Sequence, residues 1–159
     1  MEKKIVRRKD REQDENFALM VADKCEYAIM SMVLEDGSPY CIPLSIARDG
    51  DFIYFHCAYE GQKIDALKSH PSVCLSCVGD TRRAEDEFTT EYESAVIFGT
   101  AQRVEEEKEK IHALRLICER HTPKNMKNFD KAIGTSLNRT DIWRSSIRHI
   151  TGKAKKISR

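Results

Sequence analysis

The sequence predicts an α+β protein that is mainly β, in which antiparallel strands curl into a barrel and helices flank them. Short runs rich in Val and Ile alternate with turn sequences such as EDGS at 35–38, which favour β-hairpins. A long amphipathic pattern over 105–121 predicts a helix late in the chain. The motifs G-x-G-x-x-G and G-x-x-x-x-G-K-[ST] do not occur, so a doubly wound nucleotide-binding fold is not supported. A length of 159 residues indicates a single domain, 1–159.

The first helix is expected to begin near Asp14 and to end near Lys24. Aspartate is a preferred residue at a helix N-cap, because its carboxylate accepts a hydrogen bond from the first turn. Phe17, Met20 and Val21 recur at helical spacing and would form the apolar face that packs on the rest of the protein.

Three short strands are expected next, over 27–33, 40–47 and 52–56. Turn sequences at 35–38 and 49–51 separate them, so the three strands would form an antiparallel meander. Pro43 lies inside the second strand. Because proline has no backbone N–H to donate to a neighbouring strand, it favours an edge strand or a bulge there.

The helix over 105–121 is the clearest element of the second half, since acidic residues begin it, Arg120 and His121 end it, and Pro123 stops it. The other expected elements are a short helix from 61 that ends before Pro71, a strand over 73–79, a charged loop over 81–90, a long strand over 92–104 bent at Gly99, a short helix over 127–137 and a last strand over 142–150.

The charge balance excludes several classes of partner. The formal net charge is +1, so no overall field favours nucleic acid or a membrane surface. No apolar run reaches the ~20 residues that a membrane span needs, and the charged start lacks the apolar core of a signal peptide. We therefore expect a cytoplasmic protein. Basic residues cluster at both ends of the chain. This pattern is typical of solvated, frayed termini, or of a tail that covers a partner or an anionic ligand. The residues are Lys3, Lys4, Arg7, Arg8, Lys9, Lys153, Lys155 and Lys156.

Cys74 and Cys77 form a C-x-x-C sequence, which can indicate redox or zinc chemistry. The surrounding residues, PSVCLSCVGD, are typical of a strand. Positions three apart in a strand point to opposite faces, so the two thiols could not easily share a metal or a disulfide. We interpret both cysteines as small buried hydrophobic residues and predict no metal site.

The segment YFHCAYEGQK at 54–63 carries the most chemical information. It places His56 at the end of a strand, and Gly61 and Lys63 at the start of a helix. The first backbone N–H groups of a helix have no internal partner and attract anions, a glycine lets a phosphate approach closely, and a lysine adds charge. This pattern predicts a phosphate-binding turn. A histidine there could orient a ligand or transfer a proton near neutral pH.

Each of these residues also has a purely structural explanation. His56 could be a buried histidine that is hydrogen-bonded to the backbone, and Lys63 could be an ordinary solvated lysine of a short helix. Spacing alone does not decide between these alternatives.

The sequence YFHCAYEGQKIDAL resembles the Y-F-H-x-A-x-E-G-x-K-x-D-x-L motif of the nitroimidazole-resistance (Nim) proteins, a branch of the pyridoxamine 5'-phosphate oxidase-like FMN-binding split barrels. Further similar segments occur in the matching order, from about Arg7 to Lys155; they are RRKDR, GSPYCIPLS, FTTEYESAVIFGTA, the glutamate-rich helix and ITGKA. The central motif is fairly specific, and the others add weight together.

This resemblance implies a split β-barrel, a homodimer with FMN bound across the subunit interface, and flavin-dependent reduction of a small oxidised organic compound such as a nitroaromatic or a 5-nitroimidazole. His56 matches the site histidine and is the expected catalytic residue, and Lys63 matches the lysine beside the flavin phosphate. Tyr92 and Ser94 match a strand near the site. The expected FMN-binding residues are Pro43, Leu44, Ser45, His56, Cys57, Ala58, Gly61 and Lys63.

The chain departs from the family pattern at Cys57, Gln62 and Ala95, where glycine or serine, arginine and valine are more usual. These departures affect the expected flavin affinity and substrate choice. Fold alone does not determine chemistry, so two alternatives stay open. One is a non-catalytic protein that stores a flavin or binds heme through His56, and the other is a dimeric scaffold with a vestigial pocket.

Overall fold

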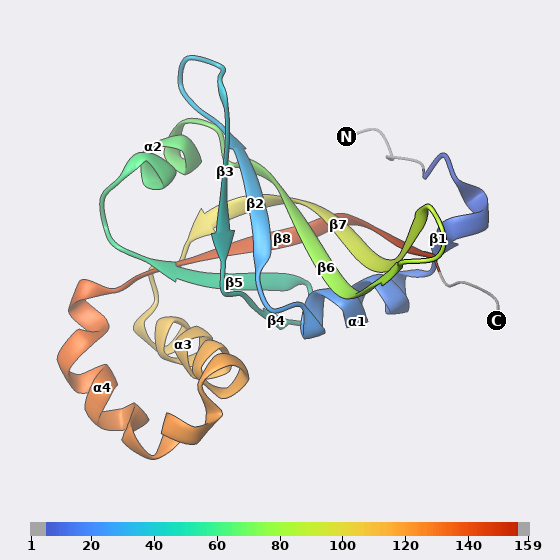
Figure 1. Ribbon diagram of the computed structural model, residues 1–159. Coiled ribbons are helices and arrows are strands. Elements are labelled where there is room, and N and C mark those ends of the chain that lie inside the picture. The colour runs from blue at the N-terminus through green and yellow to red at the C-terminus, as the bar shows by residue number, and fades with distance from the viewer. Residues whose placement is uncertain (1–5, 156–159) are drawn as a thin grey trace.

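The computed structural model describes residues 6–155 (Figure 1). Seven strands follow one another across a single antiparallel sheet in the order β3-β2-β6-β7-β8-β5-β4, and β1 pairs with β8 outside this path. The strands are β1 (Glu12–Gln13), β2 (Ala28–Val33), β3 (Pro39–Leu44), β4 (Ala47–Asp49), β5 (Phe52–Cys57), β6 (Ser72–Ala84), β7 (Thr89–Arg103) and β8 (Asp141–Lys155). The helices are α1 (Glu15–Lys24), α2 (Gln62–Ser69), α3 (Glu107–His121) and α4 (Phe129–Ser136). The expected α+β split barrel with flanking helices is confirmed.

The split lies between β3 and β4, the two edge strands of the sheet. Leu44 ends β3 and Ala47 begins β4. Three extended residues span at most about 11 Å, so the sheet must curl until its two edges approach each other. The expected strand over 40–47 is therefore wrong in one respect, because the chain leaves the first edge after Leu44 and joins the other at Ala47. Ile46 between them is fully buried, and its carbonyl oxygen lies 2.8 Å from Nε2 of His121 instead of pairing in the sheet.

The expected three-strand meander is also wrong. β2 pairs with β3, and β4 pairs with β5, but β5 pairs on its other side with β8. The turns at 35–38 and 49–51 do form hairpins, with positive φ at Gly37 and Gly50. The β2–β3 hairpin therefore forms one edge of the sheet, and the β4–β5 hairpin forms the opposite edge. Pro43 lies on the edge strand β3, as its missing donor requires.

Alternate side chains of the strands fill the barrel, among them Met30, Phe55, Leu75 and Ile97, each fully buried. The predicted N-cap of α1 is confirmed, because Oδ1 of Asp14 accepts a hydrogen bond of 2.8 Å from the backbone N–H of Phe17. α1 packs across β6, β7 and β8 (Figure 1). Its Ala18 lies against Gly152 of β8, so this helix covers the inner side of the sheet.

β6 and β7 form a longer hairpin than expected. The residues predicted as a charged loop, 81–90, are mostly strand, because β6 continues to Ala84 and β7 starts at Thr89. Arg82 of β6 forms an ion pair with Glu91 of β7, directly across the ladder. Opposite charges on facing strand positions stabilise such a pair, so a charged sequence here indicates cross-strand pairing.

The second half of the chain otherwise follows the expected order. Helix α3 starts two residues later than expected, and α4 is flanked by 3-10 turns at Pro123–Asn128 and Leu137–Arg139. A second apolar cluster joins these helices to the outer side of β5 and β8, with Tyr54 and Ile142 against Leu114 and Ile117. The β7–β8 register shifts between Phe98 and Gly99, and the bend expected at Gly99 stays a prediction.

Parts of the basic ends lie within residues 6–155 and make contacts there, and the expectation of frayed termini stays a prediction. Arg8 forms an ion pair with Asp10, and β1 pairs with Lys153 and its neighbour in β8. β8 extends five residues beyond the expected last strand, to Lys155. The clustered residues Lys3, Lys4 and Lys156 lie outside the described residues. Within residues 6–155, no helix is both long and apolar enough to cross a membrane.

Candidate functional site

The connection between β5 and α2 brings together the residues of the central motif. Alternation along β5 sends Phe55 into the barrel and leaves His56 exposed on the side of α3. Cys57 is half-buried and packs against the barrel core. Ala58 is exposed at the start of the connection. Two consecutive residues thus face opposite sides of the sheet, and only His56 presents its side chain to solvent.

The N-terminus of α2 has the features of an anion site. Gly61 is the N-cap residue, with φ of 127°, a region that side-chain-bearing residues rarely adopt. No side chain caps this helix end, and the space where a Cβ of residue 61 would point is open. Lys63 is half-buried in the first turn, and none of the ion pairs among residues 6–155 uses its ammonium group. Free helical N–H groups, a glycine and an unpaired lysine are donors that fit a phosphate group.

Burial favours a neutral imidazole at His56 and a neutral thiol at Cys57. Partial burial lowers the pKa of His56, and the positive charges of Lys63 and His121 lower it further. His56 is therefore neutral at pH 7 and carries one donor and one acceptor nitrogen. Burial raises the pKa of Cys57 to about 11, so its sulfur is a thiol at neutral pH. The positive charge of Lys63 acts on both residues, since it lowers the pKa of His56 and opposes the rise in the pKa of Cys57.

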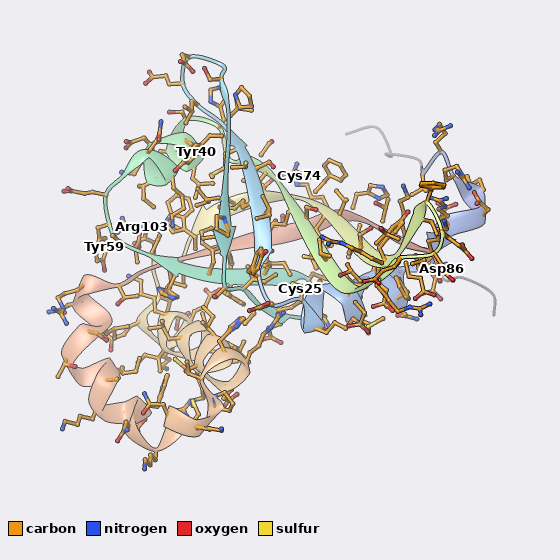
Figure 2. The ribbon with its side chains drawn as sticks, in the orientation of Figure 1. Cys25, Tyr40, Tyr59, Cys74, Asp86 and Arg103 are labelled. Carbon is orange, nitrogen blue, oxygen red and sulfur yellow. The ribbon has the colours of Figure 1, made fainter. Side chains whose placement is uncertain are left out.

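The structure adds a group of residues that the sequence did not single out. Asp141, paired with Cys57 across β5 and β8, is 1% exposed. Its Oδ1 accepts a 2.8 Å hydrogen bond from Nε of Arg103, and its Oδ2 accepts a 2.9 Å bond from Nε1 of Trp143. The Arg103 guanidinium lies 5.1 Å from the centre of the Tyr59 ring, and Figure 2 shows both beside the β5–α2 connection. The only signal in the sequence is an acidic residue directly before two large apolar residues, in DIW.

The three site residues expected on the second strand lie in different surroundings. Pro43 is exposed on the edge strand, the Leu44 side chain is buried in the barrel core, and Ser45 is exposed in the break between β3 and β4. The next residue, Ile46, contacts His121, whose charge acts on His56. The break and the end of β5 are therefore neighbours, although Leu44 can offer only backbone atoms to a ligand.

Two continuous rows of uncharged or weakly basic side chains lie on the side of the sheet that points away from the barrel core. We call these two rows the outer face. Cross-strand partners define these rows as Pro43, Ile29, Ser76, Val96 and Thr151, and as Cys41, Ser31, Cys74, Phe98 and His149. Most of these side chains are half-buried or exposed. The C-x-x-C interpretation is consistent with this geometry, because Cys74 lies on the outer face and Cys77 is buried in the core.

Two hollows adjoin the far end of the outer face, away from α2. One has a volume of about 420 Å³, and the other about 500 Å³. Tyr92, which matches a strand near the site in the family, lines the first, together with Arg82 and Lys155. Tyr27 and Val78 line the second. None of the expected FMN-binding residues lines either hollow.

A comparison with protein-family profiles matches residues 28–154 to the family described as pyridoxamine 5'-phosphate oxidase. No protein of curated function matches the sequence. Among solved structures, a candidate 5-nitroimidazole antibiotic resistance protein from Bacteroides thetaiotaomicron is 21% identical, with a TM-score of 0.73, over 91% of this chain and 89% of that one.

Two other similar structures come from cofactor-binding proteins. The flavocytochrome Anf3 from Azotobacter vinelandii is 20% identical with a TM-score of 0.81, over 96% of this chain and 73% of that chain. The FAD and heme binding protein from Mycobacterium smegmatis is 19% identical with a TM-score of 0.78, over 92% of this chain and 74% of that chain. These identities show a shared fold. Since the family profile spans most of the chain, including β5, the α2 turn and the outer face, the protein belongs to the pyridoxamine 5'-phosphate oxidase family.

Proposed function

We propose that this protein binds FMN as a homodimer and uses the reduced flavin to reduce a small oxidised organic compound such as a nitroaromatic. The observation that carries the proposal is the half-buried Lys63 without an ion-pair partner among residues 6–155, beside the uncapped N-terminus of α2 at Gly61. Similar structures from a flavocytochrome and from a FAD and heme binding protein support a flavin as the phosphate-bearing ligand.

The residues between the end of β5 and the first turn of α2, which we call the α2 turn, would each bind a different part of the ligands. Gly61 lets a phosphate approach the helix N–H groups, and Lys63 neutralises part of its charge. The flavin supplies the electron-transfer chemistry, while the protein supplies binding and orientation. His56, neutral and exposed, can donate one hydrogen bond to a substrate or cofactor oxygen. Cys57, a thiol with a raised pKa, would act by packing.

The outer face supports the homodimer. A sheet face with ten uncharged or weakly basic positions in two rows, Ile29, Val96 and Phe98 among them, is unusual for a surface that stays in water. Such a face suits a second copy of the same chain, because one patch then serves both partners.

Replacing Lys63 by alanine is expected to weaken FMN binding about tenfold or more, because one charge-assisted phosphate contact contributes roughly 1.5–3 kcal/mol. The measurement is titration of the purified protein with FMN, followed by flavin absorption and fluorescence. The matched control is Lys68→Ala in the last turn of the same helix, an exposed lysine away from the N-terminus. It should leave the dissociation constant unchanged.

The outcomes separate the candidate functions. Equal FMN affinity in the wild type and Lys63→Ala would remove the α2 turn from the phosphate site. Absence of flavin binding after reconstitution would remove the flavoprotein proposal. A Soret band that is lost in His56→Ala would identify heme binding instead. Bound flavin that is not reoxidised by nitro compounds would indicate a storage protein.

Replacing Ser31 by arginine is expected to convert the dimer to a monomer. Ser31 is exposed on the outer face, between Cys41 of the edge strand and Cys74 of β6, so a charge buried there by a partner would lack an ion-pair partner. Sedimentation equilibrium should give twice the 18.3 kDa chain mass for the wild type and the single mass for the variant. The control Ala132→Arg, exposed on α4, should stay dimeric. A monomeric wild type would contradict the dimer without bearing on FMN affinity.

A further inference from the structure

A second reactive cluster lies away from the α2 turn, where α1 ends against the sheet. Cys25 is the C-cap residue of α1. Cys77 belongs to β6 and pairs with Ala28 of β2, which follows Cys25 by three residues. The two side chains are 2% and 0% exposed and belong to the same core cluster. The Cys77 side chain is close enough to Cys25 to affect its pKa, and the Cys25 thiol donates a hydrogen bond of 3.3 Å to the carbonyl oxygen of Ala22. Neither cysteine is in a disulfide, so both are thiols.

Arg120 of α3 extends to this pair. Its Nη2 donates to the carbonyl oxygens of Cys25 at 2.6 Å and of Ala22 at 3.0 Å, and lies 3.6 Å from the Cys25 sulfur. Its Nη1 is buried and has no hydrogen-bond partner. A guanidinium with a free donor beside a sulfur stabilises negative charge on that sulfur.

The surroundings make the two thiols unequal. The pKa of Cys25 is lowered, first by its interaction with the Cys77 side chain and then by the charge of Arg120, against the opposing effects of burial and of Asp23. The pKa of Cys77 is raised by the same interaction and by burial. Cys25 therefore has the lower pKa of the two thiols, and once it has lost its proton it is the attacking sulfur beside the Cys77 thiol.

Access to Cys25 requires only a small reagent. The Cys25 side chain is 2% exposed, and its two chain neighbours, Lys24 and Glu26, are exposed. Hydrogen peroxide is close to water in size. Helix C-termini open more readily than core strands, so brief fraying at the end of α1 would admit it.

We propose that Cys25 and Cys77 form a reversible disulfide in the presence of hydrogen peroxide. The Cys25 thiolate attacks one peroxide oxygen, forming an S–O bond and breaking the O–O bond, and the leaving hydroxide takes up a proton to become water. The Cys77 sulfur, losing its proton, then attacks the Cys25 sulfenic acid, forming the S–S bond and releasing a second water. The two cysteines lose two electrons to one peroxide. A dithiol reductant reverses the reaction.

The test is peptide mapping. The whole protein is treated with hydrogen peroxide, its remaining thiols are alkylated in denaturant, and it is then digested with trypsin without reductant. Cys25 falls in tryptic peptide 25–48 with Cys41, and Cys77 in peptide 69–82 with Cys74. The double variant C41S/C74S leaves one cysteine in each peptide. We expect a cross-linked species lighter by two hydrogen atoms than the sum of the two peptides, and its loss on treatment with dithiothreitol. Fragmentation of the wild-type species provides the same assignment without a variant.

Arg120→Gln is expected to slow formation of the disulfide about tenfold, since a rise of one unit in the pKa of Cys25 lowers its thiolate fraction by that factor. Arg115→Gln on the same helix, where the arginine pairs with exposed Asp130, should leave the rate unchanged. The proposal is overturned if Cys25 and Cys77 are both recovered alkylated after peroxide has oxidised exposed Cys41. It is also overturned if Cys25 proceeds to sulfinic acid while Cys77 stays free.

Discussion

Replacing Asp141 by alanine is expected to destabilise the protein by about 3 kcal/mol. The carboxylate is 1% exposed and serves two donors, the guanidinium of Arg103 and the indole N–H of Trp143. Removing it leaves the buried indole N–H without an acceptor, which costs roughly 1–3 kcal/mol. The Arg103 side chain is 36% exposed and can turn toward water, so the lost ion pair adds less than the 3–5 kcal/mol of a fully buried pair. The measurement is equilibrium urea unfolding followed by Trp143 fluorescence and circular dichroism.

Asp141→Asn separates the two contributions. The amide oxygen can still accept from Trp143, while the charge opposite Arg103 is removed, so the loss should be smaller than in Asp141→Ala. The control is Asp130→Ala, which removes the exposed partner of Arg115 at 3.4 Å and should cost less than about 0.5 kcal/mol. A change below 1 kcal/mol in Asp141→Ala would mean that water replaces the carboxylate at the barrel end.

The Asp141 cluster also explains why part of the site escaped sequence-based prediction. Asp14, Gly61 and Lys63 could be found because a helix N-terminus is a local feature, set by residues within one turn. Asp141 and Arg103 come from separate strands, and their contact exists only because β7 and β8 pair over their whole length. A single sequence contains no signal for that register.

The wrong strand predictions have a similar physical cause. Hydrophobic alternation continues from Tyr40 through Ala47, so periodicity alone predicts one strand there. The strand is interrupted because the barrel closes there. The Ile46 side chain is buried in the core, and its carbonyl oxygen lies 2.8 Å from Nε2 of His121. The charged arm at 81–90 was misassigned because its stability comes from cross-strand pairs such as Arg82 and Glu91, which propensity does not register. The proposed dimerisation likewise depends on a face that exists only in the folded sheet.

Replacing Gly99 by alanine is expected to destabilise the protein at the upper end of the ~1–3 kcal/mol range that overpacking costs. A Cβ at this position would lie 2.1 Å from the backbone oxygen of Ser146 and 2.2 Å from Oγ of Ser145. The oxygen of Ser146 belongs to the main chain of β8, so it cannot turn away like a side chain. Relief would require the two longest strands to separate at the register shift between Phe98 and Gly99.

The matched control for this substitution is Gly134→Ala in α4, where a Cβ would meet nothing within 4 Å. Alanine is the better helix former by about 1 kcal/mol, so this variant should be as stable as the wild type or slightly more stable. The two substitutions add the same methyl group, and their opposite expected effects on the unfolding midpoint isolate the steric contact. If Gly99→Ala unfolds at the wild-type midpoint, β8 must be able to shift at Ser146, and the close approach of the two strands is then not fixed by the absence of a side chain. A loss confined to Gly99→Ala would instead show that the pairing of β7 with β8 at this register shift requires a residue without a side chain.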